Sequence, residues 1–307
     1  MRFIYKKSQF TKNSIVSIIY KVIYYGGEIN SMLKKSLNLF FMAMLILSLG
    51  ACSSNEASSD TTNSSTDQVE QDESSENEEV HWSYEGETGP EHWAELDSAN
   101  ALCTNGTEQS PINIDSAKAL KEENAKKVQI KYGSSTSVSI MNNGHTVQAN
   151  LLDENNRIIL DGTEYKLSQF HFHTPSEHQF DGENYNMELH LVHTDKDGNI
   201  AVLGLMIKEG SENKDLASIW NVIPEEKTDA DVPVNDPINL NNLLPEDQSA
   251  YYYNGSLTTP PCSESVKWTV FKDPIEMSKQ QIDIFQNIFH DNHRQVQSLN
   301  DREVKSY

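Results

Sequence analysis

Basic residues are scarce in this sequence, which has 24 lysines and arginines against 46 aspartates and glutamates and a formal net charge of −22. Nucleic-acid binding requires a basic surface, so this balance excludes that class of function. Hydrophobic residues make up 36% of the chain and form no run as long as a membrane span, which excludes a multi-spanning membrane protein. Three cysteines are too few for a disulfide-rich scaffold or a cysteine-rich zinc module. The composition therefore predicts a soluble, acidic domain.

The N-terminal part has the features of a secretion signal. Met32 is followed by two lysines and an apolar run, 37–49, whose 13 residues suit a signal-peptide core and are too few to span a membrane. Gly50 and Ala51 then precede Cys52, which resembles the lipobox of bacterial lipoproteins, where the signal is removed and the cysteine is lipidated. We expect residues 32–51 to be a signal peptide and Cys52 to be anchored to a bacterial membrane, facing away from the cytoplasm. The alternative is an ordinary secretory signal.

The segments on either side of this signal differ from it. Residues 1–31 fit no signal pattern, and their Gly-Gly-Glu run at 26–28 has purine-rich codons, like a ribosome-binding site, just before Met32. We expect translation to begin at Met32, so that residues 1–31 are a mis-annotated upstream segment. The alternative is that they form an unusually long n-region of the signal peptide. Residues 52–79 hold nine acidic residues, no basic one and almost no apolar side chains, which predicts a disordered tether.

Residues 80–307 contain no repeat and no linker-like break, so we expect a single domain; 36 acidic and 17 basic residues give it a net charge of −19. Between residues 128 and 207, short runs of alternating apolar and polar residues are separated by turn pairs, the pattern of strands joined by hairpins. These pairs are Asn143-Gly144, Asp161-Gly162, Asp181-Gly182 and Asp197-Gly198. Helical patterns are confined to 215–222 and 278–290, the second capped by Ser278. The sequence predicts a mainly β domain with short peripheral helices.

Three histidines stand at strand spacing in two neighbouring segments. If 166–173 is a strand, His171 and His173 project from one face about 7 Å apart at the backbone, as two ligands of one metal ion do. The same parity places Leu167 and Gln169 on that face. In the second segment, 187–193, His190 shares a face with Glu188 and Val192, so His190 completes a three-nitrogen site if the strands pair.

Three protein nitrogens and one open position are typical of catalytic zinc sites, although cobalt or iron could occupy the same geometry. His193 is the alternative third ligand. Parity places His193 with Leu189 and Leu191 on the core face, so we interpret it as a buried, hydrogen-bonded structural histidine, and His178 likewise.

Four motifs together resemble the α-class carbonic anhydrases. They are Ser-Gln-Phe-His-Phe-His (168–173), Ser-Glu-His (176–178), Glu-Leu-His-Leu-Val-His (188–193) and Gly-Ser-Leu-Thr-Thr-Pro-Pro (255–261). The segments 81–84, 89–93, 109–114 and 292–296 resemble that family too, so the resemblance runs from about residue 81 to 305. It implies a ten-stranded, mostly antiparallel twisted sheet with a zinc ion at the foot of a conical cavity.

The resemblance also implies roles for individual residues. Zn²⁺ is held by His171, His173 and His190, and a zinc-bound hydroxide attacks CO₂ to give bicarbonate and a proton. Thr258 accepts the hydrogen bond of the hydroxide and donates its own to Glu177, while His145 carries the proton away; a surface histidine in a turn is the alternative for His145. Sulfonamides and anions are expected inhibitors.

Other residues support this set by the same resemblance. Gln169 and Glu188 orient His171 and His190. Thr259 contacts bicarbonate, and the apolar pocket for CO₂ is formed by Val192, Val202, Leu257 and Trp268.

With Cys52 lipidated, Cys103 and Cys262 remain as a pair in an oxidising compartment, which favours a disulfide over two free thiols. Secreted members of the resembled family carry a disulfide at these places. Two rival functions remain. A catalytically silent binding module on the same fold typically lacks a zinc histidine, and all three are present. A zinc-scavenging lipoprotein usually has histidine-rich flexible tracts, and the tether has no histidine.

Overall fold

The structure is a computed structural model, and it describes residues 81–307. The expected upstream segment (1–31), signal peptide (32–51) and tether with its lipidated Cys52 (52–79) lie outside the described residues. Within 81–307, no helix combines the length and the apolar character needed to cross a membrane.

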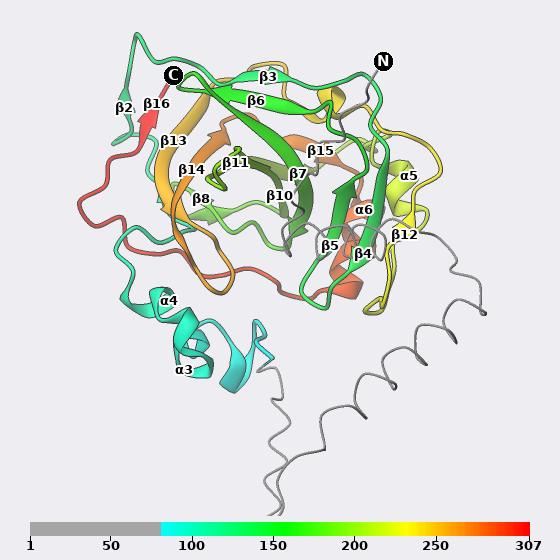
Figure 1. The fold of residues 1–307 in the computed structure, drawn as a ribbon, viewed down its shortest axis with the longest axis horizontal. Helices are drawn as coiled ribbons and strands as arrows, with labels where there is room; N and C mark the ends of the chain where they lie inside the picture. Colours follow the sequence, from blue (N-terminus) through cyan, green and yellow to red (C-terminus); the bar gives the residue numbers. More distant parts are fainter. Residues whose placement is uncertain (1–80) are drawn as a thin grey trace, which may run out of the picture. The chain divides into compact units, whose positions relative to one another are not determined.

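A large twisted sheet dominates the described part of the chain (Figure 1). Its thirteen strands are β2 (Leu120–Lys121), β3 (Gln129–Lys131), β4 (Val138–Asn142), β5 (Val147–Leu151), β6 (Arg157–Leu160), β7 (Thr163–His173), β10 (Met187–Thr194), β11 (Ile200–Glu209), β12 (Val232–Pro233), β13 (Ala250–Ser256), β14 (Glu264–Phe271), β15 (Ile275–Met277) and β16 (Lys305–Ser306). A second, three-stranded sheet contains β1 (Asn113–Ile114), β8 (Gln179–Phe180) and β9 (Glu183–Asn184).

Ten of the thirteen strands follow one continuous path, in the order β12-β4-β5-β7-β10-β11-β14-β13-β16-β2. Off this path, β15 pairs with β11, β6 pairs with β7, and β3 pairs with β6. Most neighbours are antiparallel, and the parallel pairs of the large sheet are β11 with β14, β11 with β15, and β16 with β2. The expected mainly β, mostly antiparallel domain is confirmed, with three strands added beside the ten-strand path.

The helices are short and peripheral, as expected. They are the α-helices α3 (Trp93–Leu96), α4 (Leu102–Asn105), α5 (Ala217–Trp220) and α6 (Lys279–Ile288), and the 3₁₀ turns η2 (Gly86–Thr88), η3 (Ser98–Asn100) and η4 (Leu240–Leu243). In α6, the Ser278 side chain accepts from the Gln281 N–H while the Gln281 side chain receives the Ser278 N–H, a complete capping box. The expected helix at 215–222 is reduced to the single turn α5.

The four expected turn pairs lie between consecutive strands. Their glycines 144, 162, 182 and 198 all have φ between 85° and 90°, a left-handed conformation that costs glycine little because it has no Cβ. The turn chemistry therefore fixes the hairpin β6–β7 and the hairpin β10–β11 that flank the centre of the sheet.

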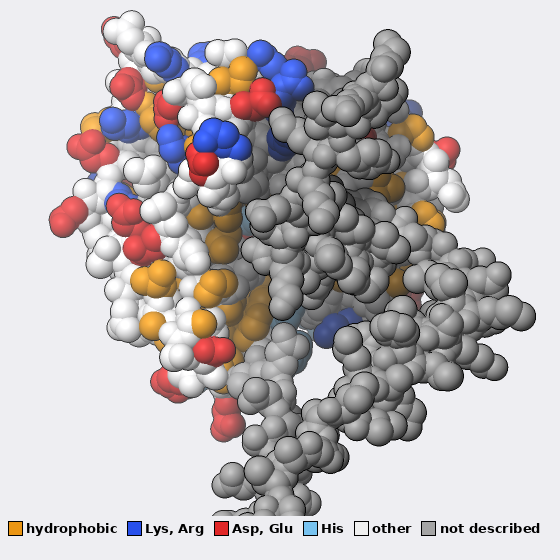
Figure 2. Space-filling view, viewed as in Figure 1, with side chains coloured by type: hydrophobic (Ala, Val, Ile, Leu, Met, Phe, Trp, Pro, Cys, Tyr) orange, Lys and Arg blue, Asp and Glu red, His pale blue; other side chains and the backbone are white. Residues whose placement is uncertain are grey.

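The two faces of the sheet pack against different apolar clusters. One cluster contains Phe170 and Phe172 of β7 together with Phe285 of α6, whose ring centroid lies 5.9 Å from that of Phe172. The other contains Val202 of β11 and Trp268 of β14. Figure 2 shows Asp and Glu side chains spread over the described part of one face, with Lys and Arg gathered near its upper edge.

The parity expected for Leu167 is wrong. The register between β7 and β10 shifts between Val192 and His193, so that Val192 faces Gln169 but His193 faces Leu167. Ser168 has no partner on β10 and forms a β-bulge. This extra residue reverses the side of the sheet to which the side chains before it point. Leu167 therefore joins the Phe170 cluster, whereas Gln169 stays on the face of the histidines.

Candidate metal centre

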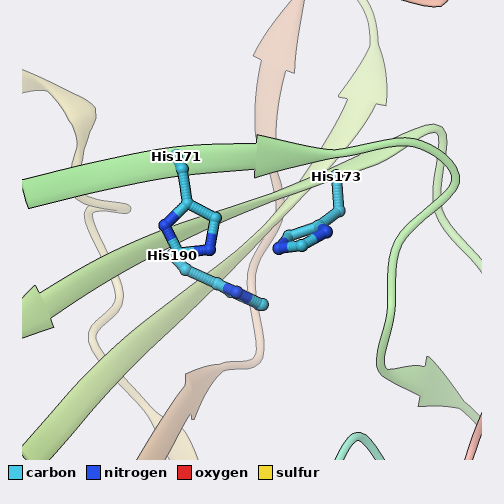
Figure 3. A group of neighbouring side chains, drawn as sticks. All are labelled: His171, His173 and His190. Atoms are coloured by element: carbon cyan, nitrogen blue, oxygen red, sulfur yellow. The ribbon is translucent and has the colours of Figure 1, made fainter. Parts of the chain in front are cut away.

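The three expected ligand histidines meet on one face of the central strands. His190 of β10 pairs directly with His171 of β7, and His173 is paired with Glu188. The ring centroids of the three histidines lie 4.7–5.2 Å apart, and their donor atoms lie within 4.8 Å of one another. Figure 3 shows two rings leaving one strand and the third approaching from its neighbour, all three converging on a common point.

Each imidazole is held by its second nitrogen, which leaves the other nitrogen free to bind a metal. Nδ1 of His171 lies 2.8 Å from Oε1 of Gln169, and Nδ1 of His173 lies 2.7 Å from the carbonyl oxygen of Asn292. Because both acceptors require a protonated Nδ1, the lone pair of each ring is on Nε2. Nε2 of His173 is buried and has no hydrogen-bond partner among the described residues.

The third ring is turned the other way around. Nε2 of His190 lies 2.9 Å from Oε1 of Glu188, although the two are not aligned as a hydrogen bond. The adjacent carboxylate favours the proton on Nε2, which leaves the lone pair on Nδ1 to bind a metal. Glu188 is itself fully buried and accepts from the backbone N–H groups of Glu177 and His178 as well as from Nδ1 of His178. Burial acts to raise the pKa of Glu188, but His178 and His190 together hold it well below its usual range. The carboxylate is therefore an ionised group fixed beside Nε2 of His190.

Burial keeps the three imidazoles neutral. It lowers the pKa of His173 to about 4 and those of His171 and His190 in the same direction, and the neighbouring rings add to the effect. Neutral imidazole is the form that binds transition metals. An unpaired buried nitrogen, three neutral rings with fixed tautomers and a shared focus fit Zn²⁺.

No carboxylate fills a fourth position in this group. Glu177, buried in the loop after β7, places Oε2 3.5 Å from Nε2 of His173 and 3.8 Å from Nδ1 of His190. It borders the focus without joining the set of mutually close donors. Three nitrogens with an open side are the arrangement of catalytic zinc sites, whereas structural sites fill all four positions.

Glu177 is held by its two oxygens in different ways. Oε1 accepts from the backbone N–H of Arg294 at 2.9 Å. Oε2 has no well-aligned hydrogen-bond partner among residues 81–307. Burial raises the pKa of Glu177, while His190, the Arg294 N–H and the Thr258 hydroxyl counteract this rise. Thr258, which is also buried, has its hydroxyl near this carboxylate.

His145 lies in the β4–β5 hairpin and is half-buried. Its ring stacks on Trp82, with centroids 3.6 Å apart and planes 6° from parallel, and its centroid lies 5.2 Å from that of His81. The carbonyl oxygen of His145 accepts from the Asn292 side chain. Burial lowers the pKa of His145 to about 4, with smaller contributions from His81 and Lys227. This ring is held by its surroundings and is not a free surface histidine.

The expected apolar pocket residues gather in one cluster. Val202 and Trp268 are buried in the second core, and Val192 and Leu257 pack against it half-buried. The Trp268 ring centroid lies 4.9 Å from that of His190, which places this cluster next to the metal focus. Thr259 is half-buried, and its carbonyl oxygen accepts from the N–H of Cys262.

The remaining histidines and the cysteines also have clear places. Cys103 and Cys262 form a disulfide, as expected. His193 is buried between the Tyr132 hydroxyl and the carbonyl oxygen of Ala201. His178 is buried between Glu188 and the Tyr253 hydroxyl, so both histidines are hydrogen-bonded structural residues, as interpreted from the sequence.

Sequence reasoning missed the support that arrives from the C-terminal segment. Asn292 accepts from His173 through its carbonyl and donates from its side chain to Phe172 and His145. Arg294 donates its N–H to Glu177. These contacts join residues more than 100 positions apart, so no local spacing could reveal them. The only available signal was the family-like run at 292–296.

Comparisons with known proteins agree with this geometry. The family described as eukaryotic-type carbonic anhydrase matches residues 88–307. A carbonic anhydrase of Pectobacterium atrosepticum is 42% identical over 224 residues, covering 73% of this chain and 89% of that protein. The solved α-carbonic anhydrase of Thermovibrio ammonificans, in complex with the inhibitor sulfanilamide, is 45% identical with a TM-score of 0.71, covering 74% of this chain and 99% of its own.

The fold is also shared by dioscorin, solved in complex with ascorbate, which is 28% identical with a TM-score of 0.69 over 74% of this chain and 98% of its own. The match to the carbonic anhydrase family covers the central strands, the three histidines and the C-terminal segment that supports them. This chain belongs to the eukaryotic-type, or α-class, carbonic anhydrase family.

Proposed function

We propose that this carbonic anhydrase hydrates CO₂ reversibly to bicarbonate and a proton, using one Zn²⁺ ion bound by His171, His173 and His190. The observation that carries the proposal is the set of three neutral imidazoles with fixed tautomers and a common focus. When bound, zinc supplies Lewis acidity that makes a water molecule nucleophilic near neutral pH, a property for which carbonic anhydrase itself is the standard example.

Glu177 and Thr258 orient the nucleophile in this mechanism. The Glu177 carboxylate is fixed on one side by the Arg294 N–H and presents its other oxygen toward the metal focus. An ionised carboxylate can only accept hydrogen bonds, so the Thr258 hydroxyl donates its hydrogen bond to Glu177. The Thr258 oxygen is then left as an acceptor for the proton of the attacking oxygen, which turns a lone pair of that oxygen toward the carbon of CO₂.

The apolar cluster beside the focus suits a substrate without charge. Val192, Val202, Leu257 and Trp268 offer CO₂ no hydrogen bond and exclude bulk water from the side of His190. Thr259 lies at the same loop as Thr258 and contacts the bicarbonate product in this proposal. Sulfonamides and small anions are expected to compete for the same place, as sulfanilamide binds the relative from Thermovibrio ammonificans.

The reaction releases a proton, and His145 is the proposed group that removes it. Imidazole exchanges protons near neutral pH when it is exposed to solvent. In the stacked position on Trp82, burial disfavours the protonated ring, so we propose that the transfer occurs when His145 moves to a position more exposed to solvent. We propose that His145 accepts the proton as neutral imidazole and passes it to buffer on the solvent side.

The cellular place of the enzyme is a proposal from the sequence. Residues 37–49 and Cys52 have the pattern of a lipoprotein signal, and Cys103 and Cys262 form a disulfide, which persists in oxidising compartments. We propose a protein anchored by lipid on Cys52 to the outer side of a bacterial cell membrane, with the membrane contacted only through that lipid. Labelled palmitate incorporated into the wild type but not into Cys52→Ser tests the anchor.

The activity is tested by stopped-flow CO₂ hydration with the zinc-loaded protein and with the same protein after chelation. The expected result is zinc-dependent acceleration that sulfanilamide inhibits. The proposal fails if the zinc-loaded protein does not accelerate hydration over the uncatalysed rate. A matched control is His193→Gln, which alters a buried histidine outside the metal group and should retain zinc.

A further inference from the structure

Arg294 is a buried cation whose guanidinium is not paired with a carboxylate among residues 81–307. Its side chain is 1% exposed, and it forms no ion pair with any described carboxylate. It lies in the stretch between α6 and β16, where residues 291–299 form neither helix nor strand. Burying a guanidinium is costly unless its donors are satisfied, so the contacts that it makes in this position require an explanation.

The guanidinium is satisfied by neutral acceptors on the N-terminal segment. Nη1 donates to Oε1 of Gln109 and to the carbonyl oxygen of Ser110, both at 2.8 Å, and Nη2 donates to the carbonyl oxygen of Cys103 at 2.7 Å. The guanidinium carbon also lies 5.7 Å from the centroid of the buried Trp93 ring. Arginine suits this place because its planar fork reaches acceptors on two sides at once.

The main chain of the same short segment contacts the active site at two points. The Arg294 N–H donates to Oε1 of Glu177, and two residues earlier the Asn292 carbonyl accepts from His173. No helix or strand ladder fixes residues 292–294. The Asn292 N–H donates to the carbonyl oxygen of Thr174, and two side chains supply further anchors for this backbone. Asn292 supplies one anchor through its side-chain amide, and the Arg294 fork supplies the other.

We propose that Arg294 is a positioning residue for CO₂ hydration, whose anchored guanidinium fixes the backbone N–H that orients the Glu177 carboxylate. This inference rests on the proposed role of Glu177 and adds a residue that does not touch the substrate. It assigns the function to the fork geometry and not to the positive charge alone. Arg294→Lys keeps the charge but not the planar fork, so it should support the backbone N–H only partly as well as the wild-type arginine does.

Arg302 offers a matched control in the same C-terminal segment. Its guanidinium also donates to three backbone carbonyl oxygens, those of Ser298, Leu299 and Asn254, and its carbon lies 5.6 Å from the centroid of the Tyr253 ring. Its backbone makes no hydrogen bond to Glu177. Arg302→Gln removes a comparable set of structural contacts without altering the support of the carboxylate.

The experiment compares zinc-loaded wild type, Arg294→Gln, Arg294→Lys and Arg302→Gln. It measures zinc content, thermal midpoint, kcat/KM for CO₂ at saturating buffer, and hydrogen exchange of the residue 294 amide. We expect Arg294→Gln to keep one zinc, to lose about tenfold in kcat/KM and to exchange that amide at least about tenfold faster, since one aligned hydrogen bond is worth roughly this factor. Arg294→Lys should fall between, and Arg302→Gln should lower only the midpoint.

The outcomes separate this inference from the proposed function. A wild type that does not hydrate CO₂ contradicts the proposed function itself. An active wild type with zinc-loaded Arg294→Gln at wild-type kcat/KM and unchanged amide exchange overturns the inference alone. If Arg294→Gln does not fold, Arg294→Lys decides, and wild-type values for both readouts in that variant would also overturn it.

Discussion

The disulfide between Cys103 and Cys262 gives a prediction whose size follows from its place in the chain. The two cysteines are 159 positions apart, so the bond closes most of the folded domain into one loop. In the chain-entropy description, closing a loop of this length stabilises the native state by about 5 kcal/mol at 25 °C. Removal of native disulfides typically costs 2–5 kcal/mol, and whole-domain stabilities are about 5–15 kcal/mol. The bond thus accounts for a large fraction of the free energy of unfolding.

The perturbation is the double variant Cys103→Ser/Cys262→Ser, assayed by urea unfolding at equilibrium. We expect the free energy of unfolding to fall by about 3–5 kcal/mol and the thermal midpoint by about 6–20 °C. The m-value should rise, because the unfolded chain without the cross-link exposes more surface. Cys52→Ser, outside the described residues and in the expected tether, is the control and should change neither quantity. An unchanged midpoint and m-value in the double variant would refute the loop-closure reasoning.

Three further predictions concern the buried histidines and their supports. Burial lowers the pKa of His193 to about 3, so below pH 6.5 the unfolded state binds a proton that the native state does not, and the free energy of unfolding decreases as the pH is lowered. Between pH 6.5 and 4, His193→Gln should lose up to about 3 kcal/mol less of this free energy than the wild type does. Parallel curves of stability against pH would contradict this. Glu188→Gln should weaken zinc binding about 10–100-fold in a chelator competition, whereas Glu276→Gln, an exposed carboxylate paired with Lys208, should leave it unchanged; equal affinities of both variants would exclude the orienting role. His145→Ala should slow CO₂ hydration in weak buffer and recover in concentrated imidazole, and a variant as fast as the wild type in weak buffer would show that another group carries the proton.

The strand-level features of the site were predictable because they depend only on alternation. Parity placed His171, His173 and Gln169 on one face of β7, and the observed register sets His190 directly opposite His171. Leu167 shows where this reasoning ends. The bulge at Ser168 reverses its face, and a bulge leaves no sign in a pattern of apolar and polar residues.

The long-range supports could not be predicted from spacing. Asn292 and Arg294 act on His173 and Glu177 across more than 110 residues, through an irregular segment whose position depends on the whole fold. The stacking of His145 on Trp82 likewise joins two segments that are distant in the sequence. The strands β2, β12 and β16 could not be predicted from the sequence because each has only two residues, too few to show alternation.

In the proposed site, three imidazoles hold one zinc ion and leave one side of it open to solvent. The most direct test is the X-ray absorption spectrum of the purified, zinc-loaded protein, combined with its zinc stoichiometry. We expect one zinc per chain with three nitrogen ligands at about 2.0–2.1 Å and one light-atom ligand from solvent, and no bound zinc in His171→Ala. A zinc ion with four protein ligands, or full zinc retention by His171→Ala, would contradict this proposal.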